Sequence, residues 1–110
     1  MENEIRNLIR NTLNITECNP SKTLSIPCFI LDYSYFEKGN VFGNGICKYS
    51  DHFVQIDIYY FKKSDFKSAI NLLKKSIKDN FIYPNIDSYY DTTNKFYRAT
   101  LQFVVQEREG

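Results

Sequence analysis

The chain has 110 residues, and its 14 Lys and Arg against 13 Asp and Glu give a net charge of +1. This length indicates a single domain, residues 1–110. Positive and negative charges are nearly balanced, which does not favour a nucleic-acid binder, because such a protein needs a clustered basic surface. Three cysteines at long spacings, without a CxxC pair, favour reduced thiols over a disulfide framework or a zinc site.

The first third of the chain predicts a helix and then a strand. Residues 2–14 carry a narrow apolar stripe at helical spacing, and two acidic residues lie near the N-terminal end of that helix, where the dipole favours them. Residues 26–34 alternate with the period of a strand. Pro27 is compatible with the start of that strand, because proline donates no hydrogen bond to a sheet.

Residues 35–50 are the least regular part of the sequence and contain three of its four glycines. A segment this rich in Gly and Asn turns sharply and loses much entropy when it is ordered. Its apolar residues would be of little use in a fully solvated loop. We therefore predict a projecting hairpin or long loop that packs on a neighbouring chain through four residues: Phe36, Val41, Phe42 and Ile46.

A strand and a helix follow, separated by only two lysines. Residues 52–61 alternate, with Val54, Ile56 and Ile58 on one face and Gln55 and Asp57 on the other. Residues 64–80 then change to helical spacing. An apolar stripe of the helix is expected to cover the apolar strand face: Phe66, Ala69, Ile70, Leu73 and Ile77. Ser64 is predicted as the N-cap and Asn80 as a left-handed C-terminal residue.

The remaining residues predict an extended segment over 81–91, a turn at Asp91–Asn94 and a final amphipathic strand over 95–106. The resulting order is α-β-β-α-β-β. We expect an α+β two-layer sandwich in which a mainly antiparallel four-stranded sheet carries two helices on one face.

No pattern in the sequence indicates a catalytic, cofactor or metal site. His52 is the only histidine, and we expect it to be an exposed residue at a strand end. Asp57 and Arg98 lie on the polar faces of two strands, where they predict a cross-strand ion pair. The segment Gly43-Asn-Gly45 leads to a strand and lacks the Lys-Ser/Thr of a phosphate-binding loop. The lysines of residues 62–78 are interpreted as a solvated helix face.

In the order of these elements, the chain resembles small tail-completion proteins of tailed bacteriophages, the tail terminators. A Pro-containing strand, Ile26–Leu31, leads through a Gly-containing loop to the Val-Gln-Ile-Asp-Ile strand of residues 52–58. An amphipathic helix then ends before Asn80-Phe81, where many relatives have Gly-Phe. Tyr89-Tyr-Asp91, a short turn and Phe96–Phe103 are similar to the ending typical of the family.

The resemblance implies a structural protein without enzymatic activity. Such proteins form rings, usually hexameric, that cap the head-proximal end of a phage or phage-like tail tube and end its polymerisation. The implied partners are further copies of the chain, the tail tube protein, and in some particles sheath and head-connector proteins. DNA would pass through the ring without specific binding, and no membrane is involved. The implied location is the tail of a virion or bacteriocin-like particle assembled in the bacterial cytoplasm.

Two surfaces are predicted to make the contacts of such a ring. One is the apolar set in residues 35–50 given above. The other is a polar sheet face towards the lumen or an adjacent subunit, formed by Gln55, Asp57, Arg98, Thr100 and Gln102. A head–tail adaptor in the same particle and a small hydrolase that uses Cys47 and His52 are the alternatives.

Overall fold

The computed structural model describes residues 1–19, 21–42 and 45–109, and for residues 38–42, 45–49 and 108–109 it describes the backbone only. It contains two helices and five strands. In chain order these are α1 (Glu2–Leu13), β1 (Thr16–Glu17), β2 (Cys28–Phe42), β3 (Gly45–Tyr60), α2 (Lys63–Asn80), β4 (Asn85–Asp91) and β5 (Phe96–Glu109).

The strands form one mixed sheet in the order β1-β2-β3-β5-β4. β1 pairs in parallel with the start of β2, and all other pairs are antiparallel. The predicted four-stranded, mainly antiparallel sheet with the order α-β-β-α-β-β is therefore wrong. β1 has only two residues, too few to show an alternating pattern. Its pairing depends on the position of the chain at the end of α1.

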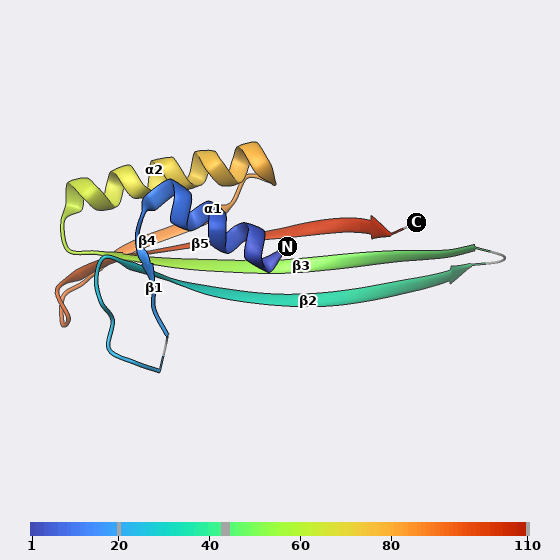
Figure 1. Ribbon diagram of the computed structural model, residues 1–110, viewed down its shortest axis with the longest axis horizontal. Coiled ribbons are helices and arrows are strands. Elements are labelled where there is room, and N and C mark those ends of the chain that lie inside the picture. Colours follow the sequence, from blue (N-terminus) through green and yellow to red (C-terminus); the bar gives the residue numbers. More distant parts are fainter. Residues whose placement is uncertain (20, 43–44, 110) are drawn as a thin grey trace.

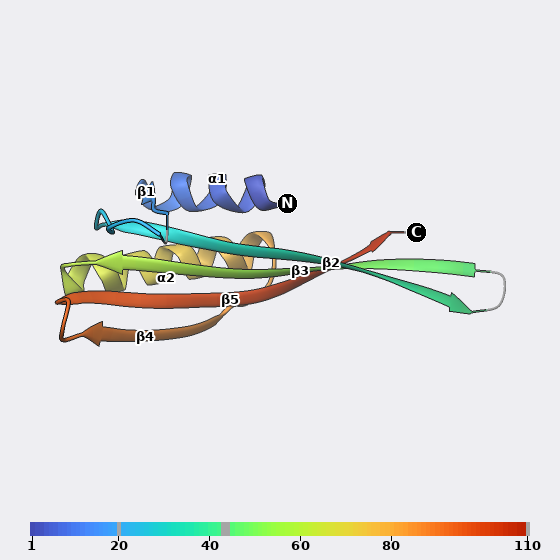
Figure 2. The same ribbon diagram turned by 90° about the horizontal axis from the view of Figure 1, so that it is seen from below.

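Figure 1 shows α1 and α2 lying together on one side of the strands, and Figure 2 shows strands β2, β3, β5 and β4 running side by side. Apolar residues from the helices and from alternate strand positions fill the space between the layers. The fully buried members include Ile5, Ile9, Phe29, Ile56, Ile58, Leu73, Ile77, Ala99 and Leu101. This core confirms the predicted alternation of β3 and four positions of the predicted α2 stripe, Phe66, Ala69, Leu73 and Ile77.

The segment that looked irregular in the sequence is a continuous hairpin of two long strands. Antiparallel pairing runs from Cys28 opposite Tyr59 to Phe42 opposite Gly45. We call its distal part, residues 36–42 and 45–51, the arm, and Figure 1 shows it extending past the helices. The arm makes the molecule 57 Å long against 29 and 21 Å. The radius of gyration is 16.3 Å, whereas about 13 Å is typical of a compact chain of this length.

The ends of α2 differ from the prediction. The helix begins one residue earlier, after an extended Lys62, and no side chain caps it, so Ser64 is not the N-cap. Asn80 does not adopt a left-handed conformation. Instead its side-chain amide donates a 2.8 Å hydrogen bond to the carbonyl of Ser76 one turn earlier. Among the described helices, none combines the length and apolar character required to cross a membrane.

Candidate functional site

The face of the sheet opposite the helices is covered by neither helix, and we call it the outer sheet face (Figure 2). The strand register assigns alternate residues to it. Gln55 and Asp57 of β3 lie opposite Gln102 and Thr100 of β5, and Arg98 lies opposite Tyr59. The register therefore brings the five predicted polar residues into one area.

Asp57 is the centre of this polar area and is only 6% exposed. Its Oδ1 accepts a 2.5 Å hydrogen bond from the hydroxyl of Thr100. Its Oδ2 accepts bonds from Arg98 Nη2 at 3.3 Å and from Gln55 Nε2 at 3.4 Å. Gln102 Nε2 donates in turn to Gln55 Oε1 at 2.9 Å. Because both carboxylate oxygens accept hydrogen bonds, Asp57 has the environment of a structural anion, and the predicted ion pair with Arg98 is confirmed.

Arg98 is held from three sides. Its Nη1 donates a 3.0 Å hydrogen bond to the hydroxyl of Tyr89. Its guanidinium carbon lies 5.7 Å from the ring centre of Tyr59 and 5.9 Å from that of Tyr89, within cation–π range. Burial lowers the pKa of Arg98, but the charge of Asp57 and the bond to Tyr89 outweigh it and raise the pKa above its ordinary value. Arg98 therefore remains charged and fixed in place.

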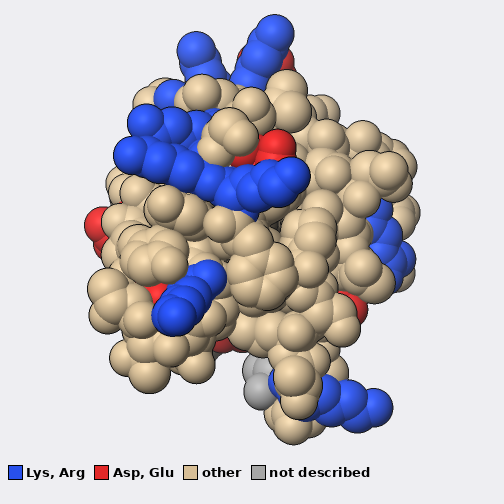
Figure 3. Space-filling model, turned by 90° about the vertical axis from the view of Figure 1, so that its left-hand side faces the viewer, with Lys and Arg blue, Asp and Glu red and all other residues tan. Residues whose placement is uncertain are grey.

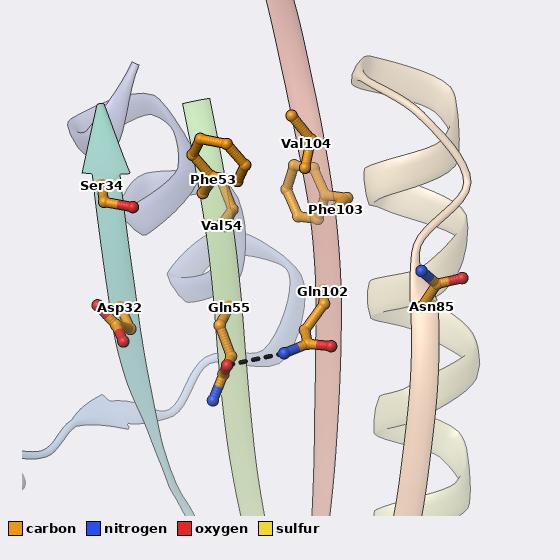
Figure 4. Close-up of a pocket in the computed structure, with 9 residues that line it drawn as sticks. All are labelled: Asp32, Ser34, Phe53, Val54, Gln55, Asn85, Gln102, Phe103 and Val104. Carbon is orange, nitrogen blue, oxygen red and sulfur yellow. Dashed lines mark hydrogen bonds between the residues drawn. The ribbon is translucent and has the colours of Figure 1, made fainter. Parts of the chain in front are cut away.

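An apolar patch adjoins the polar area towards the arm. It consists of Phe36, Phe53 and Val104, which are 53%, 44% and 45% exposed. Phe53 lies opposite Val104, and Phe36 lies diagonally from Phe53. Between the patch and the polar area is a hollow of about 400 Å³ with the Gln55–Gln102 pair at its centre (Figure 4). Side chains of this kind, exposed as a group and rimmed by polar residues, are typical of protein interfaces.

The predicted interface residues thus fall into two groups. Phe36, Gln55, Asp57, Arg98, Thr100 and Gln102 all lie on the outer sheet face. Val41, Phe42 and Ile46 belong to the arm, but their side chains lie outside the described residues. Phe53 and Val104 were missed, although both occupy strand positions that alternate with core residues and could have been recognised as apolar residues on a polar face.

The charges of the two layers differ in sign. By the strand register, the outer sheet face carries three basic positions, Lys38, Arg98 and Arg108, against five aspartates: Asp32, Asp51, Asp57, Asp87 and Asp91. The segment from Lys62 to Asn80 carries six lysines against Asp65 and Asp79. Figure 3 shows Lys and Arg side chains gathered over the end of the molecule where α2 begins. Attractive contact is therefore possible between the helix layer of one molecule and an acidic partner, whereas the outer sheet face disfavours phosphate.

A second polar cluster lies on the helix side of the sheet, where the arm begins. His52 is 6% exposed, so the expected exposed strand-end histidine is wrong. Its Nδ1 shares a hydrogen bond with the hydroxyl of Tyr33, and its Nε2 lies 3.5 Å from Glu107 Oε2. Tyr35 contacts the same ring and bonds to the buried Ser50 at 3.2 Å. The signal was available, because His52 continues the core-facing series of Val54, Ile56 and Ile58.

Within the described residues, no three His, Cys, Asp or Glu side chains gather as they would around a metal ion. No protein-family model matches the chain, and no curated protein matches it either.

Proposed function

We propose that this protein is a structural component that caps the head-proximal end of a phage or phage-like tail tube as a homo-oligomeric ring, most simply a hexamer. The observation that carries the proposal is the combination of a projecting arm with an uncovered sheet face in so small a protein. It agrees with the resemblance of the strand and helix order to tail terminators.

The arm supports an assembly role because it extends beyond the two helices (Figure 1). The sheet continues into the arm, where neither helix lies over it. There β5 pairs with β3 as far as Lys48 opposite Glu109. Such an extended element exposes much surface for its length and becomes fully packed only against a second chain.

The sheet edges support contacts of the kind that close a ring. β1 pairs only with Cys28 and Phe29, so the same edge of β2 from Ile30 onward pairs with no strand of the described residues. On the opposite side of the sheet, β4 begins at Asn85, which pairs with Gln102, so β5 beyond Gln102 has no pairing with β4. Two different open edges on one protomer allow heterologous contacts, and heterologous contacts form a ring when the rotation closes.

The charge distribution favours an orientation in which the polar area of the outer sheet face lines the lumen, while the apolar patch beside it packs on a neighbouring subunit. Its excess of aspartates repels DNA phosphates, so DNA can pass without being bound. Gln55 and Gln102 are neutral and are bonded to each other, so they add no charge to this surface.

The hydrolase alternative has little support from the backbone. Cys47 and His52 are five positions apart on the extended strand β3, which separates their Cα atoms by about 16 Å. A hydrogen-bonded Cys–His pair requires a much shorter separation.

The decisive experiment measures the mass of the purified protein by sedimentation, alone and mixed with tail tubes purified without heads, and locates it by electron microscopy. We expect a ring at one end of each tube, and tubes of abnormal length when the gene is deleted. Binding to isolated head connectors but not to tubes would indicate the head–tail adaptor instead. A monomer that binds neither structure would refute both assignments.

A further inference from the structure

Two cysteines lie on segments that the fold brings together at the β1 edge of the sheet. Cys18 directly follows β1, and Cys28 is the first residue of β2. The parallel pairing places Thr16 opposite Cys28. The backbone N–H of Cys18 then donates a 2.8 Å hydrogen bond to the carbonyl of Phe29. The backbone therefore holds Cys18 beside the start of β2.

The loop before β2 brings a backbone group to the same place. The N–H of Ser25 donates to Cys18 Sγ with an N···S distance of 3.5 Å, and Ser25 and Cys18 are both close enough to Cys28 to affect the pKa of its thiol. Both cysteines are free. A disulfide between neighbouring thiols at this edge of the sheet requires a local movement of the chain that brings the two sulfur atoms to bonding distance.

The two thiols differ in accessibility. Cys18 is half-buried, whereas Cys28 is fully buried. Burial, and after it the neighbouring Cys18 thiol, raises the pKa of Cys28 to about 12. A small oxidant in solution therefore meets Cys18 first, and Cys28 is placed to react with whatever forms on Cys18.

We propose that Cys18 and Cys28 close into an intramolecular disulfide when the protein meets a small-molecule disulfide. The Cys18 sulfur attacks one sulfur of the oxidant, forms a mixed disulfide and releases one small thiolate. The Cys28 sulfur then attacks Cys18 Sγ, breaks the mixed disulfide and releases the second small thiolate. The two cysteines are oxidised, the oxidant is reduced, and the protons of the cysteine thiols pass to the two released thiolates.

The bond would fasten the shortest strand of the sheet to its neighbour. β1 is held to β2 by two register pairs, Thr16 with Cys28 and Glu17 with Phe29. A covalent link across residues 18–28 restricts the unfolded chain and so raises the melting temperature. This inference does not depend on the proposed function, because it follows from the position of the two thiols alone.

The test incubates the full-length protein with oxidised glutathione and then counts free thiols and maps the tryptic peptides. Trypsin cuts after Lys22, between the two cysteines, so a disulfide appears as two linked peptides. We expect two of the three thiols to be lost and the melting temperature to rise by about 10 °C. Dithiothreitol should reverse both changes.

Two variants serve as controls. Cys47→Ser should still form the bond, because Cys47 has no part in it. Cys18→Ser, a change at a half-buried position, should leave the Cys28 thiol unreacted. The proposal is overturned if all three thiols remain free, if glutathione stays on Cys18, or if the bridges involve Cys47 or join two chains.

Discussion

At the scale of single residues, Asp57 organises the outer sheet face. Its carboxylate accepts hydrogen bonds from Thr100, Arg98 and Gln55, and it is almost completely buried. Residues from β3 and β5 are joined through this one carboxylate. The role is structural, since the same group balances the charge of Arg98 between two aromatic rings.

We predict that Asp57→Ala lowers the free energy of unfolding by about 1–3 kcal/mol, because it leaves Arg98 partly buried without its counter-ion. Urea unfolding monitored by circular dichroism measures the change. Asp87→Ala is the matched control, since Asp87 is an exposed aspartate on the same face and should change stability by less than about 0.5 kcal/mol. Equal losses in the two variants would contradict the role given to Asp57.

The hydrogen bonds of Asp91 predict how the stability of the protein changes at acidic pH. Its Oδ1 accepts the backbone N–H groups of Thr93 and Asn94, each at 3.0 Å, and thereby fixes the turn between β4 and β5. The backbone and side-chain bonds from Asn94 lower the pKa of Asp91 below its ordinary value. Because the folded-state pKa is depressed, its stabilising contribution is complete above the unfolded pKa of about 4 and is lost as pH falls through the folded value.

Asp91→Asn keeps an oxygen acceptor for this turn but removes the titrating group. We therefore expect the variant to lose less stability than the parent protein between about pH 4 and pH 2. Urea midpoints measured over this range test the expectation, and a carbon-detected NMR titration gives the Asp91 pKa directly. Identical acid dependence of the two proteins would show that the turn does not depress this pKa.

At the scale of elements, α2 is attached to the sheet by one stripe, and neighbouring leucines provide a direct test. Leu73 is fully buried in the core, whereas Leu72 is 52% exposed. Leu73→Ala should lower the free energy of unfolding by about 2–5 kcal/mol through lost burial and a cavity. Leu72→Ala should have an effect of less than about 1 kcal/mol, because both residues have good helix propensity and Leu72 loses little contact. Similar urea midpoints for the Leu73→Ala and Leu72→Ala variants would show that Leu73 does not belong to the stripe that packs on the sheet.

The predictability of the elements follows their length. α2 and β5 are long and strongly periodic, and both are close to their expected boundaries. The arm strands are also long, but Gly39 and Gly45 interrupt their pattern, so the sequence indicated a projecting segment without distinguishing a hairpin from a loop. The helix caps were wrong at both ends of α2 because the chain direction at Lys62 and Phe81 is set by the adjoining strands.

At the scale of the whole molecule, the apolar patch of Phe36, Phe53 and Val104 is where we expect a neighbouring subunit to pack. Phe53→Ser combined with Val104→Ser should shift the sedimenting species from the ring to the monomer, with little change in the unfolding midpoint, because both side chains are half-exposed. Phe61→Ser is the control. Phe61 is 61% exposed but lies at the junction before α2, so this variant should retain the ring.

An intact ring in the double variant would exclude the patch from the subunit contact while leaving the proposed cap open to test through tube binding. Dissociation of both variants would instead indicate a general loss of solubility or fold. Circular dichroism spectra of the two proteins separate these cases, since a folded monomer keeps its helix and strand signals.

The sequence alone determined the local periods and therefore the two helices, the parts of β2 and β3 outside the arm, and the division of β3 and β5 into an apolar and a polar face. These features depend on residues close together in the chain, where the repeats of 3.6 and 2.0 act directly. Only the tertiary structure decided the parallel β1, the partners of His52, and the approach of Cys18 to Cys28. Each of these contacts joins segments that are separate in the chain and are brought together by strand pairing, which no local pattern encodes.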